Sequence, residues 1–243
     1  MNLIIEQGNT RLKVAVFDGN QQVAFMSNDD GKPLAIDELY YKYYPDKCIV
    51  SSVVDKNEQL ENLLKKLFPC YIRLDETTPV PVSIEYATPD TLGNDRIAAA
   101  VGANYLKPEQ NILVIDAGTA ITYELIEKNG IYKGGNISPG LSTRFLSLNC
   151  FTRKLPLVTR QADVPLIGTS TESAILAGVV NGIVFEMDGY IDVMKAKYGD
   201  IFVFLTGGHA FYFENRLKNH IFAAANLVLT GLNRILEYNA EKN

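Results

Sequence analysis

The chain has 243 residues, of which 47% are hydrophobic and 21% charged, a balance that is typical of a folded globular protein and excludes a disordered one. The formal net charge of -5, with 23 basic against 28 acidic residues, excludes the positive overall field that binding to nucleic acid uses. The longest nearly apolar stretch, residues 174–185, is shorter than the roughly 20 residues of a membrane-spanning helix, so we expect neither nucleic acid nor a membrane as partner.

The N-terminal residues and the cysteines indicate a cytoplasmic protein. The first nine residues carry Glu6 and no basic residue, which is unlike a secretory signal. Cys48, Cys70 and Cys150 are far apart and form no Cys-x-x-Cys pair, so we expect reduced thiols. Only two histidines are present, which argues against a histidine-rich metal site.

The chain begins with a pattern that predicts a β-hairpin and a third strand. Residues 3–5 are apolar, residues 6–10 contain Gly8-Asn9, and residues 12–16 alternate with the period of a strand. A second turn at residues 18–20 leads to a strand at residues 22–26.

The middle of the chain predicts helices and one short strand. Residues 37–44 and 56–68 have helical apolar spacing, and residues 48–54 are rich in strand-forming residues. Asn94 is expected to cap a helix over residues 95–106, which ends before Pro108.

The opening pattern returns about 110 residues later. An apolar strand at residues 112–115 is followed by Asp116-Ala117-Gly118-Thr119, an alternating strand at residues 121–125, a turn at residues 127–130 and a third strand from Ile131. The repetition predicts an α/β protein built from two copies of one unit.

The sequence of the rest of the second copy, from residue 134 onward, predicts a turn, three helices and a strand. Residues 134–140 contain three glycines and are expected to form a turn before a helix at residues 141–150. Thr169 and Glu172 predict a capping box for a long helix that runs to about Lys197, with a possible break at Asp188-Gly189. A buried strand at residues 201–205 ends in Thr206-Gly207-Gly208-His209, and a last helix covers residues 227–238.

The repeated acid-x-Gly-(Asn)-Thr turns, Glu6 to Thr10 and Asp116 to Thr119, are candidates for phosphate binding. Backbone N–H groups and a threonine hydroxyl in such a turn suit an anion, and the carboxylate requires a cation such as Mg²⁺ between itself and a phosphate. One turn of this kind is typical of an ordinary hairpin, whereas two copies at matching places favour a nucleotide site. The glycines after residue 206 are compatible with a nucleobase beside the backbone or with a plain turn.

Two helix starts have both a structural and a functional interpretation. Asp95 in a first helical turn stabilises the helix, and it is also suited to act as a general base. Arg96 is suited to bind a carboxylate through two hydrogen bonds. Thr171 lies in the segment of residues 169–171, which is interpreted first as a helix cap and second as part of a binding site. Gly178 and Gly182 allow close helix packing, within the chain or across a dimer.

These motifs together resemble the type III pantothenate kinases, the first enzymes of coenzyme A synthesis in many bacteria, which belong to the superfamily of acetate and sugar kinases, heat-shock chaperone ATPases and actin. The resemblance rests on motifs in the expected order, which are Gly8-Asn9-Thr10, Leu92 to Arg96, Asp116 to Thr119, Gly134 to Gly140, and Thr171. It implies two ribonuclease H-like lobes of the actin-like ATPase duplication, with mixed five-stranded sheets flanked by helices, over residues 1–110 and 111–243, and with ATP between them.

The resemblance also implies roles for individual residues. ATP would be bound by Glu6, Gln7, Gly8, Asn9, Thr10, Arg11, Leu12, Lys13 and Thr119. Pantothenate would be bound by Tyr86, Gly93, Asn94, Asp95, Arg96 and Thr171, the last across a homodimer, and Asp95 would accept the proton of its hydroxyl. Asp116 would hold a monovalent cation, K⁺ or NH₄⁺.

One residue departs from the family pattern, which usually has Asp where this chain has Glu6. Because the glutamate side chain is longer by one methylene, a Mg²⁺ ion at this position would be held differently. Two other functions stay open from the sequence, which are a related small-molecule kinase and a nucleotide-binding regulatory protein of the same fold.

Overall fold

The computed structural model describes residues 1–8, 10–28, 36–54 and 58–241. These residues form two compact units. The first contains residues 1–109, 129–133 and 226–243, and the second contains residues 110–128 and 134–225. The change at residues 109 and 110 lies beside the boundary expected from the sequence, whereas the C-terminal residues are grouped with the first unit.

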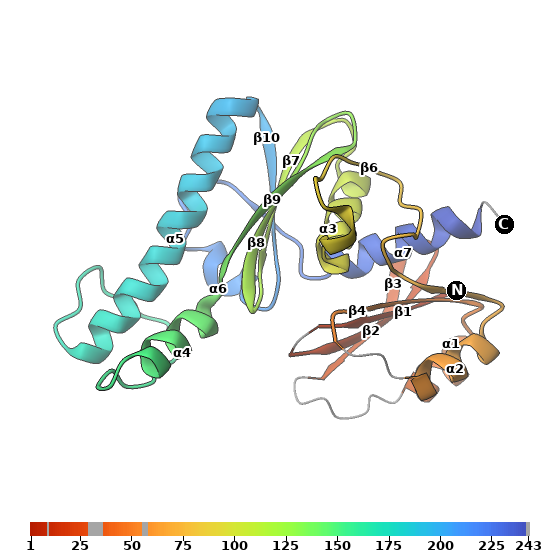
Figure 1. Cartoon of the computed structure of the whole chain (residues 1–243), viewed down its shortest axis with the longest axis horizontal. Helices are drawn as coiled ribbons and strands as arrows, with labels where there is room; N and C mark the ends of the chain where they lie inside the picture. Colours follow the sequence, from red (N-terminus) through yellow and green to blue (C-terminus); the bar gives the residue numbers. More distant parts are fainter. Residues whose placement is uncertain (9, 29–35, 55–57, 242–243) are drawn as a thin grey trace. The chain divides into compact units, whose positions relative to one another are not determined.

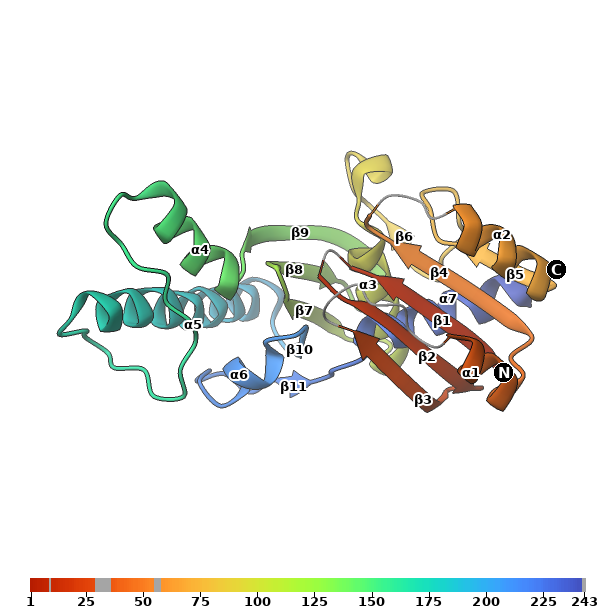
Figure 2. The same ribbon diagram turned by 90° about the horizontal axis from the view of Figure 1, so that it is seen from below.

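The first unit contains a mixed sheet of five strands in the order β3-β2-β1-β4-β5. Strands β1 (Asn2–Gln7), β2 (Leu12–Asp18) and β3 (Gln21–Asn28) are antiparallel, while β4 (Lys47–Ser52) and β5 (Cys70–Arg73) continue from β1 in parallel. Figure 2 shows β3, β2, β1 and β4 side by side in this order. The alternation seen in the sequence therefore produced the expected hairpin and third strand.

Helices cover both faces of this sheet (Figure 1). Helices α1 (Ile36–Tyr43) and α2 (Glu58–Leu67) pack against one face through Leu39 and Leu64. Helix α7 (Leu227–Ala240) packs against β1 and β4, and also against α3 (Asn94–Leu106). Because both faces are covered, β1 is buried on both sides, and its apolar residues are nearly continuous.

Polar side chains fix α7 to the start of the chain. Asn2 donates hydrogen bonds to Asn233 and Glu237, at 2.8 and 2.5 Å, and Lys47 forms an ion pair of 3.0 Å with Glu237. The last helix thus completes the unit that the first strand begins.

The second unit contains strands in the order β11-β10-β7-β8-β9. The strands are β7 (Asn111–Ala117), β8 (Ala120–Ile126), β9 (Ile131–Pro139), β10 (Ile201–Thr206) and β11 (Phe222–Ala223). The short strand β6 (Ser83–Ile84) pairs in parallel with Ile131 and Tyr132 at the start of β9, and it adds a sixth strand to the expected five; these four residues belong to the first unit. The helices are α4 (Leu141–Phe151), α5 (Thr171–Tyr198) and α6 (Ala210–Glu214), and η1 (Pro89–Thr91) is a 3₁₀ turn of the first unit.

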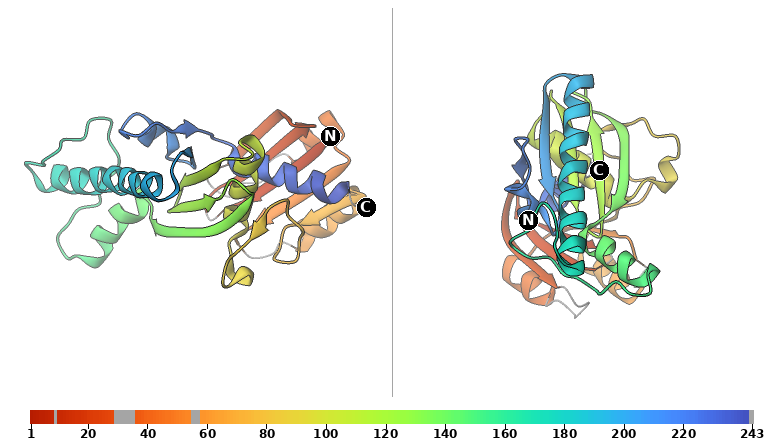
Figure 3. Two further views of the ribbon diagram at one scale, coloured as in Figure 1. Left: turned by 90° about the horizontal axis from the view of Figure 1, so that it is seen from above. Right: turned by 90° about the vertical axis from the view of Figure 1, so that its left-hand side faces the viewer.

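Helix α5 is the one helix among the described residues that is long and apolar enough to cross a membrane by length and composition. Its apolar residues Ile175, Val180, Ile183 and Met187 are buried in the core of the second unit, so it packs as a core helix. Figure 3 shows α5 as one unbroken helix, and the break that the sequence allowed at Asp188-Gly189 does not occur.

Three local predictions were wrong. Residues 134–139 continue strand β9 and are not a turn, because Gly135 packs against β8 where a Cβ would lie 1.7 Å from the carbonyl oxygen of Tyr123. Gly93 is the N-cap of α3, and Asn94 instead donates a hydrogen bond of 2.9 Å to the carbonyl of Leu74. The capping box of α5 is formed by Ser170 and Ser173.

Candidate active-site residues

The turn between β1 and β2 carries most of the residues expected to bind ATP. Glu6 and Lys13 are directly paired across the two strands, so their side chains point to the same face and form an ion pair of 2.9 Å. The Gly8 amide donates a hydrogen bond of 2.9 Å to the carbonyl of Arg11, which closes the turn. Thr10 and Arg11 are exposed on it, and Asn9 lies outside the described residues.

The other two residues of this segment have structural contacts as well. The Gln7 side chain accepts a hydrogen bond of 3.2 Å from Ser52 on β4, and Leu12 packs against the core of the first unit. These contacts hold the strand ends on either side of the turn, and Thr10 and Arg11 remain exposed.

The described residues include no group of three or more His, Cys, Asp or Glu side chains that could hold a metal ion. This finding does not conflict with a magnesium nucleotide, because Mg²⁺ in kinases is commonly held by one or two carboxylates together with the substrate phosphates. Glu6 is a single carboxylate of this kind, and Lys13 beside it offers a positive charge for a phosphate.

The start of α3 brings together the residues expected to bind pantothenate, apart from Thr171. The Asp95 carboxylate accepts a hydrogen bond of 2.9 Å from the Arg96 amide, so it lies at the positive end of the helix. Gly93 leaves room for this carboxylate, since a Cβ there would lie 2.6 Å from Asp95 Oδ1. Arg96 is only 6% exposed, and its guanidinium lies 5.7 Å from the centre of the Tyr86 ring.

In the second unit, the turn between β7 and β8 carries Asp116 and Thr119. The Gly118 amide donates a hydrogen bond of 3.0 Å to the carbonyl of Ala120, and Thr119 is exposed at the tip. Thr171 is the exposed first residue of α5, beside the N-cap Ser170.

The glycine turn after β10 lies directly against Asp116, a proximity that the sequence did not predict. Gly207 has a φ of +94°, and a Cβ there would lie 2.3 Å from Asp116 Oδ1. The His209 amide donates a hydrogen bond of 3.0 Å to the carbonyl of Ala117. The parallel pairing of β10 with β7 places Thr206 beside Asp116, and this register joins the two turns into one site.

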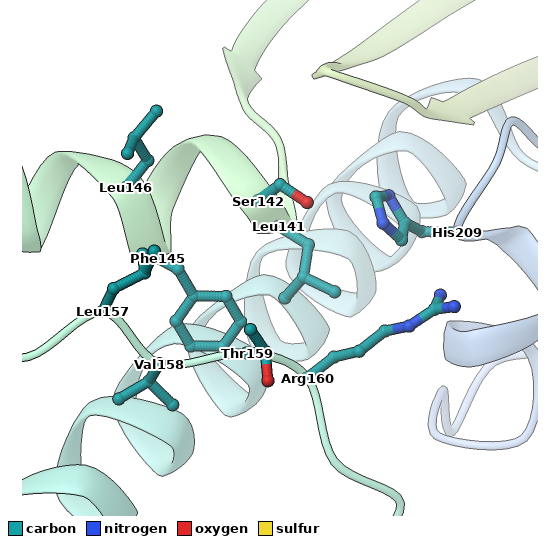
Figure 4. Close-up of a pocket in the computed structure, with 9 residues that line it drawn as sticks. All are labelled: Leu141, Ser142, Phe145, Leu146, Leu157, Val158, Thr159, Arg160 and His209. Carbon is teal, nitrogen blue, oxygen red and sulfur yellow. The ribbon is translucent and has the colours of Figure 1, made fainter. Parts of the chain in front are cut away.

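A pocket of about 500 Å³ opens beside this site (Figure 4). One end is apolar, with Phe145, Leu157 and Val158, and the other end carries the guanidinium of Arg160 and the imidazole of His209. Its remaining lining residues are Leu141, Ser142, Leu146 and Thr159. The pocket thus combines an apolar wall with polar groups next to the Asp116 turn.

The loop that forms one wall of the pocket is fixed to the region of α6. The Tyr212 hydroxyl donates a hydrogen bond of 2.7 Å to the carbonyl of Gln161, and the Arg216 guanidinium lies 4.1 Å from the centre of the Tyr212 ring. A rigid wall of this kind suits a preformed binding pocket.

Structural comparison places the chain in the fold of actin-like ATPases and sugar kinases. A conserved Baf family protein from Campylobacter jejuni has a TM-score of 0.62 at 24% identity, covering 98% of this chain and 99% of that one. The activator of 2-hydroxyisocaproyl-CoA dehydratase from Clostridium difficile, with bound ADPNP, has a TM-score of 0.55 at 13% identity, covering 100% and 97% of the two chains. At these identities the similarity shows the fold alone.

Sequence comparison is more specific. A family model described as type III pantothenate kinase matches residues 2–193. Proteins named type III pantothenate kinase from Phocaeicola vulgatus and Bacteroides fragilis are 48% and 49% identical over 239 residues, covering 98% of this chain and 99% and 98% of those proteins. The chain belongs to the type III pantothenate kinase family.

Proposed function

We propose that the protein transfers the γ-phosphoryl group of ATP to the primary hydroxyl of pantothenate, giving 4'-phosphopantothenate in the first step of coenzyme A biosynthesis. The observation that carries this proposal is the identity of 48% to a protein named type III pantothenate kinase over nearly the whole length of both chains. Kinase activity also agrees with the fold and with the two acid-x-Gly-(Asn)-Thr turns.

Asp95 acts as the general base. Its carboxylate removes the proton of the pantothenate hydroxyl as the hydroxyl oxygen attacks the γ-phosphorus, and the bond from that phosphorus to the β–γ bridging oxygen breaks to release ADP. The hydrogen bond from the Arg96 amide holds the Asp95 carboxylate in place at the helix terminus. Tyr86, Gly93, Asn94 and Arg96 hold the substrate beside it.

The phosphates of ATP are bound by residues 6–13 and by Thr119. Lys13 neutralises phosphate charge, and Glu6 is the carboxylate for Mg²⁺, which would neutralise the developing negative charge when bound. The nucleoside occupies the pocket of Figure 4, with the base against Phe145 and the sugar toward His209.

Asp116 binds a monovalent cation, K⁺ or NH₄⁺, beside the phosphates. Such ions prefer oxygen ligands, and the turn around Asp116 offers its carboxylate and neighbouring backbone carbonyls. The proposal accounts for the close packing of Gly207 on Asp116 Oδ1, which places the carboxylate in a confined position.

The protein acts as a cytoplasmic homodimer in which Thr171 contributes to the pantothenate site of the partner. The exposed residues of α5 from Ala174 to Gly189 are Ala174, Gly178, Phe185 and Gly189, and none of them is charged. A Cβ at Gly178 or Gly182 would meet nothing within 4 Å, so the small residues are not explained by contacts within the described part of the chain. The net charge of -5 is consistent with the proposal that nucleic acid is not a partner.

A coupled assay of ADP release tests the function. We expect turnover with pantothenate in the presence of Mg²⁺ and K⁺, a lower rate with Na⁺ in place of K⁺, and a phosphorylated product of the mass of phosphopantothenate. Turnover with another alcohol and none with pantothenate would point to a different small-molecule kinase. Nucleotide binding without turnover on any alcohol would support the regulatory alternative.

A further inference from the structure

The carbonyl of Thr119 accepts two hydrogen bonds from the beginning of α4. The Thr143 hydroxyl donates one at 2.7 Å, and the Gly140 amide donates the other at 3.0 Å. Thr119 lies in the turn that begins with Asp116, so α4 holds this turn from outside the hairpin to which it belongs.

The glycine-rich segment 134–140 makes this contact possible. A Cβ at Gly140 would lie 2.3 Å from the carbonyl oxygen of Gly118 and 2.5 Å from that of Thr119. Any larger residue at position 140 would separate α4 from the turn. The segment therefore brings α4 against the hairpin.

Arg144, which directly follows Thr143 in α4, fixes the start of the helix to the rest of the second unit. Its guanidinium donates hydrogen bonds of 2.8 Å to the Pro139 carbonyl and to the Ser138 hydroxyl, and it forms an ion pair of 2.5 Å with Glu186 on α5. Glu186 also accepts a hydrogen bond of 2.7 Å from the hydroxyl of Tyr123 on β8. Four elements, α4, α5, β8 and β9, are thus joined at the point where α4 begins.

The polar network is built around charged groups that are shielded from water. The side chains of Arg144 and Glu186 are 21% and 24% exposed. Burial by itself raises the pKa of Glu186, but the hydrogen bonds from Arg144, Tyr123 and Ser138 outweigh it and hold the pKa below its ordinary value. The network therefore remains ionised and intact at neutral pH.

We infer that Thr143 and Arg144 are positioning residues, which hold the Asp116–Thr119 turn in the conformation that receives the phosphates of ATP. The inference rests on the proposed function, because it assigns Thr119 to the nucleotide. Within the hairpin the turn is closed by the hydrogen bond from the Gly118 amide to the Ala120 carbonyl, and the two bonds to the Thr119 carbonyl restrict it further from outside. Preorganised donors are what phosphate binding requires, because reorganising them costs affinity.

The test is the substitution Thr143→Val, which removes the hydroxyl and keeps the shape of the side chain. Thr119 is exposed, so water replaces the lost bond in the folded protein and the melting temperature changes little. We expect Kd and KM for ATP to rise about three- to tenfold, the range of one net hydrogen bond, with the KM for pantothenate unchanged. Thr143→Ser restores the hydroxyl and is expected to restore ATP affinity.

Thr152→Val is the matched control, because the same chemical change removes a hydroxyl at the other end of α4, which donates to the Leu148 carbonyl at 2.7 Å and accepts from the Leu155 amide at 3.3 Å and makes no bond to the Asp116–Thr119 turn. It is expected to leave both KM values unchanged.

Arg144→Met is the second test variant. We expect its KM for ATP to rise about as much as that of Thr143→Val, together with a loss of stability that Thr143→Val does not share. An unchanged ATP affinity in Thr143→Val, or an equal rise in Thr152→Val, would overturn the inference.

Calorimetric binding of a non-hydrolysable ATP analogue separates this inference from the proposed function. If the protein does not turn over pantothenate but Thr143→Val still weakens the analogue, the positioning role stands and the substrate assignment fails. If the wild type phosphorylates pantothenate and the variant binds the analogue equally well, the function stands and the positioning role fails.

Discussion

Gly231 of α7 packs so closely against Ala98 of α3 that a Cβ on the glycine would lie 1.8 Å from the carbonyl oxygen of Ala98. The contact is reciprocal, since a Cβ on Gly102 of α3 would lie 2.4 Å from the carbonyl oxygen of Leu227. The two helices therefore cross backbone to backbone. Asp95 lies on the first turn of α3, so this crossing also fixes the position of the proposed base.

Gly231→Ala is expected to push α7 away from α3. Overpacking of a closed interface typically costs about 1–3 kcal/mol, which exceeds the gain in helix propensity from alanine. The free energy of unfolding, measured by urea denaturation, should fall by that amount, and turnover should fall with it. Leu106→Ala, at an exposed position of the same α3, is the control and should stay within about 0.5 kcal/mol of the wild type.

Asp95→Asn is expected to retain the fold and the binding of ATP but to lose turnover by about 10²–10⁴-fold, the contribution of a general base. The amide keeps the size of the carboxylate and cannot take the hydroxyl proton. Steady-state kinetics and nucleotide calorimetry measure the two effects separately. Asp18→Asn, at the exposed end of β2, is the matched control, and near-normal turnover in Asp95→Asn would remove the base assignment.

Glu6→Gln is expected to raise the concentration of Mg²⁺ needed for half-maximal activity. The substitution removes the only carboxylate of the β1–β2 turn and leaves Lys13 without its ion pair. The titration is followed in the coupled assay at fixed ATP. Glu58→Gln, on the exposed side of α2, should not change the Mg²⁺ dependence, and the same curve for both variants would exclude Glu6 as the magnesium carboxylate.

The ion pair between Arg144 and Glu186 makes stability depend on acid pH. Because the pKa of Glu186 is lowered in the folded protein, its contribution is fully present above the ordinary value of 4.5 and is lost as the pH falls through the folded-state pKa. Glu186→Gln should cost about 1.5–3 kcal/mol at neutral pH, the range for hydrogen bonds to a charged group. The wild type and the variant should converge below pH 4.5, as measured by denaturant unfolding across pH.

Phe185→Glu tests the proposed dimer. Phe185 is 63% exposed on the uncharged face of α5, and a glutamate there would place two charges in the interface. Light scattering after size-exclusion chromatography should give a mass near 54 kDa, about twice 26.9 kDa, for the wild type and near 27 kDa for the variant. A dimer that persists in Phe185→Glu would place the interface elsewhere.

The duplication could be predicted from the sequence because each copy has the same short-range pattern of residues. Alternating apolar residues and a glycine after an acid are local signals, and both copies formed the hairpins that these signals predict. The Glu6–Lys13 pair follows from the same alternation, since directly opposed residues of antiparallel strands share a face.

The remaining features depend on contacts between distant residues. Gly134 and Gly135 indicate a turn locally, yet they lie in β9 because the neighbouring strand leaves no space for a Cβ at Gly135. The proximity of Gly207 to Asp116 depends on the pairing of β10 with β7, about 90 residues apart in the chain. No residue of α7 indicates by its type that the helix packs against β1.

The place of α7 has a consequence for synthesis on the ribosome. Residues 110–225 emerge before the chain ends, whereas the first unit lacks its last helix until residues 226–243 have been made. Domains usually fold in the order in which they are translated. Here the N-terminal sheet lacks the helix that packs against β1 until residues 226–243 have been made, so the unit that starts first is completed after the second unit.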